Sequence, residues 1–361
     1  MNKVHVSSPT MGATIQQVID PQNSQVAAAE IHVARFRPLE PPHMPHHLQI
    51  EIITHCNLGC IMCPRTVALA KANSAESRAE WFQTMPIERY TRILDQAVDV
   101  KSISLHGLGE PLMHPHIFEL VERAVARNIA VRFTSNLTLL TPDRAERMVR
   151  SGLHRLIVSL DGATASTYES IRINASFDRL LENLSALLQT RRTLGIRWPR
   201  IDVNMVVCAV NQHQVSDIVR LCHRLGVESL MLSPVEPTNA EMLRLMCDPA
   251  DWIQLTAEAR EEAERLGLSL YIRGEPTISD SPGEENDKQT WRCMQPWSTM
   301  MIMGDGSVMP CCNIHDRKYS MGNILTEELQ EIWTGAHYQT FRKALRGPSH
   351  VPAPCNWCPD F

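Results

Sequence analysis

The sequence lacks the features that mark membrane, secreted and nucleic-acid-binding proteins. No stretch approaches the ~20 consecutive apolar residues that span a bilayer. The first 20 residues contain no continuous apolar segment of the kind found in secretory signals. The net charge of −5 offers no basic surface for a phosphate backbone. These absences predict a cytoplasmic protein that binds neither nucleic acid nor a membrane.

Cysteine is abundant in this chain, with eleven residues among 361. Disulfides are rare in a reducing cytoplasm, so most of these cysteines need another explanation. Eight of them form two groups, one at residues 56–63 and the other at residues 293–358. The other three, Cys208, Cys222 and Cys247, stand alone in apolar surroundings, and we interpret them as small buried hydrophobic residues.

The first group lies in the segment "THCNLGCIMCPRT", where Cys56, Cys60 and Cys63 share one short loop. A structural zinc site normally takes four ligands in two pairs, and this segment has three cysteines and no fourth nearby. His55 is a poor fourth ligand because it adjoins Cys56. An iron–sulfur cluster with one iron open to a small molecule therefore fits this trio better than zinc does.

The pattern of apolar segments predicts an α/β fold. Residues 1–45 have no sustained period and end in "FRPLEPPHMPHH", which indicates an N-terminal extension and linker. From residue 46, six short β-rich runs alternate with amphipathic segments, four of which end at Asn128, Gly152, Gly195 and Gly226. Strands with helical crossovers form parallel sheets, and the even spacing favours a partial (β/α)6 TIM-like barrel over residues 46–280.

Polar residues follow four of the predicted strands, in the segments "THCN", "HGLGEP", "TSN" and "SLDG". Such residues can simply terminate strands. The carboxyl ends of the strands of a barrel nevertheless meet at one rim, where active sites lie. Four polar ends at one rim therefore predict a functional site.

The C-terminal region, residues 281–361, is predicted to be a small α+β domain. It follows the polar linker "SDSPGEENDKQ", and two apolar runs flank "GDG" in the manner of a β-hairpin. A helix is expected over residues 326–345, with Thr326 as its cap. The hairpin and helix would bring Cys293, Cys311, Cys355 and Cys358 together as a closed site. Taken alone, this region favours a zinc ribbon and an iron–sulfur cluster equally.

The cysteine trio after the first strand of a barrel resembles that of the radical S-adenosylmethionine (SAM) superfamily. In that family three thiolates hold a four-iron, four-sulfur cluster whose open iron binds SAM, and cleavage of SAM gives a 5′-deoxyadenosyl radical that abstracts hydrogen from the substrate. The resemblance implies that Met62 lies beside the adenine and that Gly109 and Glu110 lie near the SAM amino group. It also implies that Asn136, Ser159, Asp161 and Arg172 contact the ribose or carboxylate. Arg172 as an ordinary surface charge is the alternative.

The C-terminal region resembles the auxiliary-cluster domains of the same superfamily, called SPASM and, in shortened form, twitch. The resemblance rests on the Cys293-x12-Gly-x4-Cys311 spacing, "GNI" and "EIW". Because only Cys312 is spare, we expect one auxiliary cluster on Cys293, Cys311, Cys355 and Cys358. Cys312 is then either unligated or a competing ligand. The cofactors implied are two 4Fe-4S clusters and SAM.

The reaction and the substrate are harder to predict from the sequence. A closed auxiliary cluster is suited to electron transfer, which favours oxidation of a small polar substrate such as a sugar, aminocyclitol or nucleoside, with flavodoxin or ferredoxin as external electron donor. Arg273 and Glu275 are catalytic candidates, although such residues more often form a structural salt bridge or lie on the surface. An epimerase or lyase, a peptide-modifying enzyme and a non-catalytic redox or metal protein are the alternatives. Residues 1–45 are too short for the leader-binding segment of many peptide-modifying relatives, which favours the small substrate.

Overall fold

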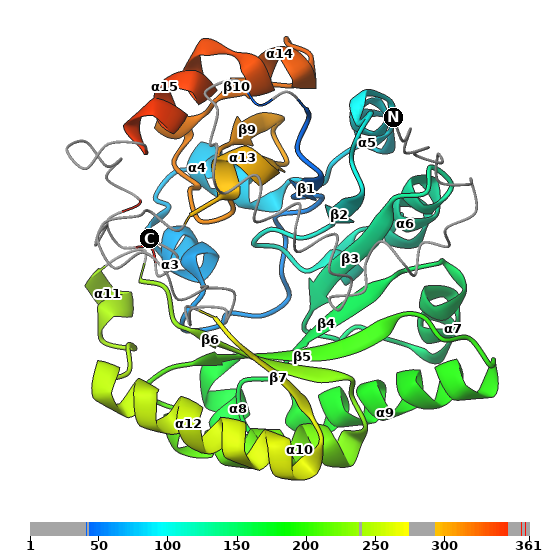
Figure 1. Ribbon diagram of the computed structural model, residues 1–361, viewed down its shortest axis with the longest axis vertical. Coiled ribbons are helices and arrows are strands. Elements are labelled where there is room, and N and C mark those ends of the chain that lie inside the picture. The colour runs from blue at the N-terminus through cyan, green and yellow to red at the C-terminus, as the bar shows by residue number, and fades with distance from the viewer. Residues whose placement is uncertain are drawn as a thin grey trace, which may run out of the picture.

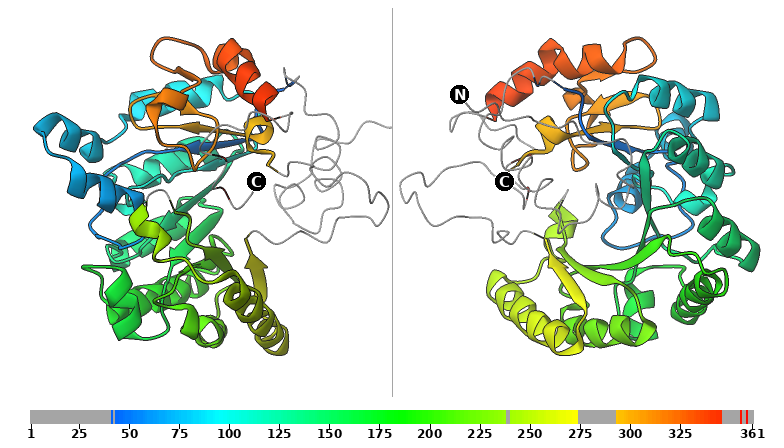
Figure 2. Two further views of the ribbon diagram at one scale, coloured as in Figure 1. Left: turned by 90° about the vertical axis from the view of Figure 1, so that its left-hand side faces the viewer. Right: turned by 45° about the vertical axis from the view of Figure 1, so that its right-hand side comes forward.

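A ten-stranded sheet forms the frame of the protein in the computed structural model, which describes residues 41, 43–237, 240–273, 293–345, 355 and 358. The sheet curves around an interior, and most helices lie on its outer face (Figures 1 and 2). The order of the strands is β10-β9-β8-β1-β2-β3-β4-β5-β6-β7. The strands are β1 His47–Ile50, β2 Ser102–Ser104, β3 Ala130–Ser135, β4 Arg155–Ser159, β5 Arg200–Val207, β6 Ser229–Pro234, β7 Ser269–Ile272, β8 Thr299–Ile302, β9 Ser307–Met309 and β10 Gly322–Asn323.

Helices follow most strands of the parallel part of the sheet. The α-helices are α3 Pro64–Lys71, α4 Ala75–Ala79, α5 Ile87–Gln96, α6 Ile117–Val125, α7 Pro142–Arg150, α8 Ala165–Ile171, α9 Phe177–Thr193, α10 Val215–Leu225, α11 Ala240–Leu243, α12 Pro249–Leu266, α13 Gln295–Ser298, α14 Leu329–Thr334 and α15 Ala336–Ala344. Short 3-10 turns are η1 Glu80–Phe82, η2 Pro111–Met113, η3 Gln212–Gln214 and η4 Arg317–Tyr319. Among the described residues, no helix combines the length and the apolar character needed to cross a bilayer.

The strands β1 to β7 are parallel throughout, which confirms the predicted partial barrel. Successive side chains of a strand point to opposite faces. In β3, Val131 and Phe133 are fully buried on the helix side. Arg132 and Thr134 alternate with these two residues along the strand and are half-buried. They lie on the other face of the sheet, which lines the barrel interior. The interior is therefore polar at these positions.

The C-terminal hairpin continues the barrel sheet. Strand β8 pairs with β1 in parallel, with His47 opposite Thr299, and β9 returns antiparallel to β8. The predicted hairpin around "GDG" is thus present, and Gly306 has a φ of +91° in its turn. The proposed domain boundaries after residues 45 and 280 stay predictions, because residues 1–40 and 274–292 lie outside the described part.

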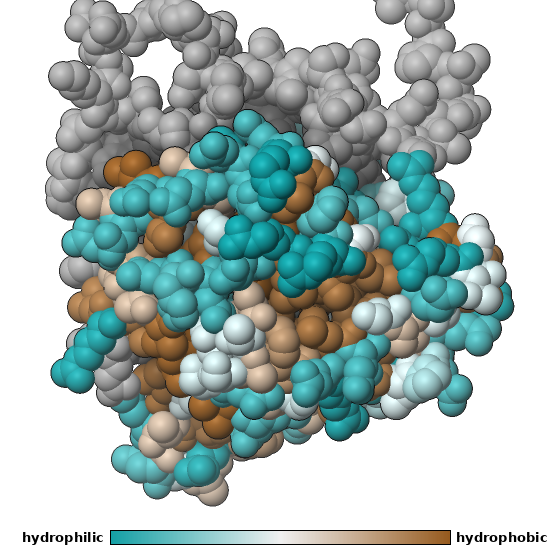
Figure 3. Space-filling view, turned by 90° about the horizontal axis from the view of Figure 1, so that it is seen from below, coloured by the Kyte–Doolittle hydropathy of each residue, from teal (hydrophilic) through white to brown (hydrophobic). Residues whose placement is uncertain are grey.

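The ends of four helical segments agree with the sequence. Asn128, Gly152, Gly195 and Gly226 have φ values of 59°, 80°, 64° and 73°, the left-handed region expected after a helix. Figure 3 shows the outer face from the side of α10 and α12, where hydrophilic side chains alternate with apolar ones. The buried side of α10 carries Val215, Ile218, Val219, Leu221 and Cys222. Both helices are therefore amphipathic, as the pattern indicated.

The helix predicted over residues 326–345 is wrong in two details. The structure contains two helices, α14 and α15, separated at Gly335, whose φ of −69° and ψ of 166° are extended. Glu328 rather than Thr326 caps α14, in a reciprocal arrangement with Glu331. Thr326 instead donates from its hydroxyl to the carbonyl of Asn323 in the preceding turn.

Candidate functional site

The first cysteine group lies on the loop between β1 and α3 and lines a cavity of about 180 Å³. Cys56, Cys60 and Cys63 all contribute to its wall, and Cys63 directly precedes the helix that begins with Pro64. Proline suits the first position of a helix because its missing N–H has no partner there. The structure thus brings the three thiols of the trio to one cavity.

The rest of the cavity is formed by the carboxyl ends of strands β2 to β5 and by nearby loops. All but one of the residues that we assigned to SAM binding from the sequence contribute to this wall. They are Met62, Gly109, Glu110, Asn136, Ser159 and Arg172. The exception is Asp161, which is fully buried and forms an ion pair with Arg172. The predicted rim of strand ends is therefore a single site.

Gly109 lets the segment after β2 pass directly against the segment after β1. A Cβ atom at this position would lie 2.1 Å from the carbonyl oxygen of Ile53 and 2.7 Å from that of His55. The neighbouring backbone N–H of Glu110 donates to the carbonyl of His55 at 2.6 Å. Because both obstacles are backbone atoms, only glycine fits, and this contact fixes the residue that precedes Cys56.

Glu110 is a buried carboxylate in the wall of the cavity, with 3% of its surface exposed. Its oxygens accept hydrogen bonds from the hydroxyl of Ser135 at 2.7 Å and from the backbone N–H groups of Asn136 and Leu112 at 2.8 and 3.0 Å. Burial raises the pKa of Glu110, although these three donors oppose the shift. Among the described residues Glu110 forms no ion pair, so an ammonium group in the cavity would supply its missing counter-charge.

Two side chains direct N–H groups toward the cysteine sulfurs. Arg172 Nη1 lies 3.8 Å from Cys60 Sγ, and its Nε donates to Asp161 Oδ2 at 2.6 Å. Asn136 Nδ2 lies 4.0 Å from Cys56 Sγ and donates to Asn57 Oδ1 at 3.0 Å. N–H donors near sulfur stabilise a thiolate relative to a thiol. Burial raises the pKa of Cys56 and Cys60, and the charge of Arg172 opposes this shift at Cys60. These N–H groups therefore favour the thiolate form at two of the three sulfurs, and Arg172 is a buried residue of the site rather than a surface charge.

The sequence analysis gave no individual role to His106, Thr134, Ser135 and Val206 of the cavity, although the first three lie in the predicted segments "HGLGEP" and "TSN". Burial and the nearby charge of Arg132 together lower the pKa of His106 to about 3, so this imidazole is neutral. Its Nδ1 is buried and has no hydrogen-bond partner among the described residues. The signal that could have found Thr134 is the alternation of polar and apolar residues in "AVRFTSN".

The C-terminal cysteines are neighbours in space. Burial raises the pKa of Cys311, and charges on Cys312, Cys293 and Cys355 raise it further. Burial, together with smaller effects of Cys293 and Cys358, raises the pKa of Cys355 to about 12. Asn313 connects two cysteines of this group, because Cys312 Sγ lies 3.5 Å from its Oδ1 and its Nδ2 lies 3.6 Å from Cys358 Sγ. Within the described ranges, no three His, Cys, Asp or Glu side chains are grouped tightly enough to hold a single metal ion.

The two catalytic candidates do not join this site. Arg273 follows β7 and forms an ion pair with Glu236. It is not among the described residues that line the cavity. Glu275 lies outside the described residues.

The three isolated cysteines differ in burial. Cys208 and Cys222 are fully buried, as predicted, whereas Cys247 is half-buried. Cys208 packs with Leu58, Cys60 and Met62 behind the cavity. Cys222 belongs to the main core.

Comparisons with known proteins agree with this arrangement. The family profile of the radical SAM superfamily matches residues 50–222, and that of an iron–sulfur cluster-binding domain named SPASM matches residues 293–359. Radical SAM domains bind a 4Fe-4S cluster and SAM, and SPASM domains bind auxiliary iron–sulfur clusters. The trio lies within the first match and the C-terminal group within the second.

Three curated relatives resemble this chain over most of its length. An AdoMet-dependent heme synthase of Methanosarcina barkeri is 25% identical over 87% of this chain and 88% of its own length. A mycofactocin maturase of Mycobacterium ulcerans is 29% identical over 88% and 81%, respectively. A PqqA peptide cyclase of Streptomyces rochei is 24% identical over 88% and 82%.

A solved structure shows the same fold. Streptococcus suis SuiB bound to its precursor peptide SuiA superposes with a TM-score of 0.69, at 18% identity, over 99% of this chain and 78% of SuiB. Fold, cavity and both profile matches lead to one assignment. The chain belongs to the radical SAM superfamily and carries a C-terminal SPASM domain.

Proposed function

We propose that this protein is a peptide-modifying radical SAM enzyme whose reaction begins in the cavity beside Cys56, Cys60 and Cys63. One observation carries this proposal. Three thiols of one loop share a cavity with a buried carboxylate, Glu110, that has no ionic partner among the described residues, and with a buried guanidinium, Arg172. That donor set fits a cluster with one open iron together with a ligand that carries an ammonium and a carboxylate, as SAM does.

When bound, the cluster and SAM supply a 5′-deoxyadenosyl radical that removes a hydrogen atom from the substrate. The protein's own residues hold the reactants in place. Glu110 accepts from the ammonium group, and Asn136, Ser159 and Arg172 donate to the carboxylate or contact the ribose. Asp161 orients Arg172 through their ion pair. Met62, which lines the cavity, would contact the adenine of bound SAM.

The peptide substrate is supported by the relatives. The sequence alone favoured a small polar compound. The PqqA peptide cyclase and the mycofactocin maturase match 88% of this chain, which favours the peptide alternative. Among the described strands, β7 and β10 are the two edges of the sheet, and we propose that a peptide enters between them.

For the net reaction we propose oxidation, with the C-terminal cysteines holding one auxiliary cluster that accepts an electron from the substrate. A fully thiolate-bound cluster has no open iron for a substrate, so electron transfer is its remaining chemistry. Flavodoxin or ferredoxin would deliver the electron that starts the reaction.

A tetrapyrrole substrate is the second candidate. The AdoMet-dependent heme synthase covers 87% of this chain and 88% of its own length, which is as complete a match as the peptide-modifying relatives give. Both candidates use the same cavity and the same first step.

The first test addresses SAM cleavage. Protein loaded with iron and sulfide without oxygen, and then reduced with dithionite, should convert SAM to 5′-deoxyadenosine, measured by mass spectrometry. Cys60→Ser should abolish the product. Cys222→Ser is the matched control, because Cys222 lies in the main core away from the cavity. Absence of 5′-deoxyadenosine from fully loaded protein, or zinc without sulfide in protein purified without oxygen, would refute the proposal.

The second test addresses the substrate. Synthetic peptides encoded by short reading frames beside the gene would be incubated with loaded protein and SAM. A change of peptide mass that requires SAM supports the peptide substrate. Conversion of a tetrapyrrole instead, with every peptide unchanged, would replace the first candidate by the second.

A further inference from the structure

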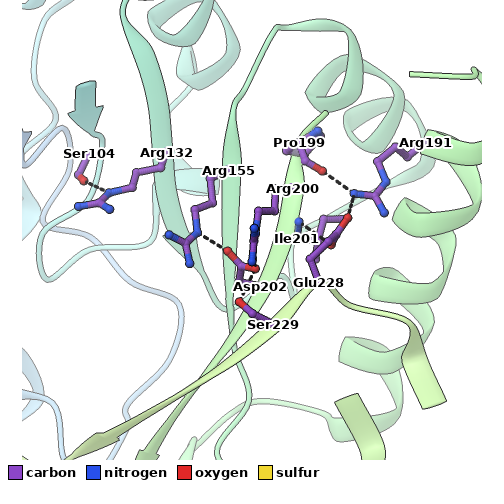
Figure 4. Close-up of polar contacts among 10 residues, drawn as sticks. All are labelled: Ser104, Arg132, Arg155, Arg191, Pro199, Arg200, Ile201, Asp202, Glu228 and Ser229. Atoms are coloured by element: carbon purple, nitrogen blue, oxygen red, sulfur yellow. Dashed lines mark hydrogen bonds and ion pairs between the residues drawn. The ribbon is translucent and has the colours of Figure 1, made fainter. Parts of the chain in front are cut away.

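Three arginines stand side by side across the barrel interior. Arg132 of β3 is in register with Arg155 of β4, which is in register with Arg200 of β5. Residues in register on parallel strands project to the same face of the sheet. Figure 4 shows Arg132 directed toward Ser104 of β2, and Arg155 and Arg200 converging on Asp202. We call Arg132, Arg155 and Arg200 the arginine row.

The arginine row carries more positive charge than its surroundings neutralise. Asp202 is the one carboxylate within ion-pair distance of these three guanidinium groups among the described residues. It accepts from Arg155 and from Arg200 Nε, the latter at 3.0 Å, and also from the hydroxyl of Ser229 at 2.6 Å. One carboxylate thus faces three guanidinium groups.

Arg132 is the member whose described partners are all neutral. Its Nε donates to Ser104 Oγ at 2.6 Å, and its Nη2 lies 3.3 Å from His47 Nε2. Burial and the charge of Arg132 together lower the pKa of His47 to about 3, so the imidazole carries no charge. A half-buried guanidinium beside a second one is costly unless an anion compensates it. A purely structural role would be better served by a second carboxylate.

The arginine row lies below the SAM cavity, on the same face of the sheet. Thr134 of the cavity wall follows Arg132 by two residues, which corresponds to about 7 Å along a strand. The row therefore faces the barrel interior below the cavity, where a substrate would extend.

We propose that the arginine row is a carboxylate-binding subsite that anchors an acidic group of the substrate below the SAM cavity. This inference rests on the proposed function, since it assumes a substrate in the barrel. Guanidinium groups bind carboxylates through two parallel hydrogen bonds, a geometry that a single lysine lacks. The side chains of Arg155 and Arg200 are 27% and 31% exposed, so a ligand in the interior can reach them. The carboxylate belongs to a peptide, either as its C-terminus or as an acidic side chain.

The test measures binding and does not depend on turnover. Dissociation constants would be measured by calorimetry on loaded protein with SAM, for acetyl-tetraalanine with a free C-terminus, for its C-terminal amide, and for the amide with one internal glutamate. Loss of a charge-assisted hydrogen bond weakens binding by about tenfold. We expect one of the two acids to bind about tenfold more tightly than the uncharged amide. Which acid does so distinguishes a terminal from a side-chain carboxylate.

Variants of the arginine row test whether these arginines cause the tighter binding of the acid. Arg132→Gln should reduce the acid-to-amide ratio toward one, and Arg132→Lys should reduce it partly. Arg150→Gln is the matched control, because Arg150 forms an exposed ion pair with Glu146 on α7, and it should keep the wild-type ratio. If Arg132→Gln does not fold, Arg132→Lys and Arg155→Gln test the same point. An unchanged ratio in the row variants that fold, or equal affinities for all probes in the wild type, would overturn the proposal.

A further pair of probes separates this inference from the peptide substrate. Protoporphyrin IX carries two carboxylates, and its dimethyl ester carries none. If the porphyrin alone shows a carboxylate preference that Arg132→Gln removes, the subsite stands and the peptide proposal fails. If no probe shows a preference while 5′-deoxyadenosine still forms, the subsite fails and the radical SAM chemistry stands.

Discussion

Arg172 donates from Nε to Oδ2 of Asp161 at 2.6 Å, and both side chains are almost completely removed from solvent. Arg172 ends α8, while Asp161 follows β4, so the ion pair ties a helix end to a strand end. Asp161 Oδ1 also accepts from the backbone N–H of Val206 at 2.7 Å, which connects β5. The other end of Arg172 reaches Cys60. Asp161 therefore positions the guanidinium that faces the cysteine trio.

Replacement of Asp161 by Asn should destabilise the protein strongly. The amide retains an acceptor for Val206 but leaves the buried charge of Arg172 without a partner. Removing one member of a buried ion pair costs about 3–5 kcal/mol. Urea unfolding of the two proteins without oxygen would measure the difference. Asp217→Asn is the control, because its ion pair with Arg220 is about half exposed and should contribute at most about 1 kcal/mol. If Asp161→Asn and Asp217→Asn lose equal amounts of unfolding free energy, this prediction is contradicted.

A methyl group at Gly109 should displace the segment that leads into the cysteine loop. The added Cβ would lie 2.1 Å from a backbone oxygen, a contact that requires the backbone to move. Gly109→Ala should therefore bind less iron at the trio and form less 5′-deoxyadenosine. Gly304→Ala is the matched control, since its Cβ would meet no atom closer than 3.6 Å. Wild-type iron content and SAM cleavage in Gly109→Ala would show that the close contact has no functional consequence.

The sequence predicted the strands and the rim because both depend on local patterns. Short apolar runs bounded by Gly, Asn and Asp determine strand ends, and in a parallel barrel these ends meet at one rim. Met62, Gly109 and Glu110 were placed at the cavity by their position after a strand and by the family resemblance.

The residues that the sequence did not reveal depend on contacts between distant segments. The pairing of β8 with β1 joins residues about 250 positions apart, and nothing in either strand specifies the partner. In the sequence, Arg132 resembles a solvent-exposed residue of an alternating strand. It faces the interior only because the barrel closes, and the sequence of one strand does not reveal that closure. The substrate could not be predicted for the same reason, since the interior surface is assembled from many strands.

Glu51 should make stability depend on pH. Its carboxylate is 1% exposed, and burial raises its pKa above the ordinary value of 4.5 despite hydrogen bonds from the N–H groups of Leu108 and Gly304. A carboxyl with a raised pKa in the folded state stabilises the fold below the unfolded pKa, and this contribution is lost as pH rises through the folded pKa. The unfolding free energy of the wild type should therefore fall relative to that of Glu51→Gln as pH rises from about 4.5.

The measurement is a pair of urea titrations at several pH values between about 4.5 and 8. Taking the difference between wild type and Glu51→Gln removes the contributions of groups that the two proteins share. If the unfolding free energy of Glu51→Gln increases relative to that of the wild type as pH rises, the raised pKa of Glu51 is supported. A constant difference would show that Glu51 titrates alike in the folded and unfolded chains.

Iron content should distinguish the two cysteine groups. Wild-type protein reconstituted without oxygen should bind about eight irons, which corresponds to two four-iron clusters. The double variant Cys293→Ala/Cys311→Ala should bind about four, because the trio retains its own cluster. It should still form 5′-deoxyadenosine but lose oxidised product, since the route for the substrate electron is gone. Cys312→Ser should retain the full iron content, as should the core control Cys222→Ser. Loss of about four irons in Cys312→Ser would make Cys312 a ligand, and about twelve irons in the wild type would require a second auxiliary cluster.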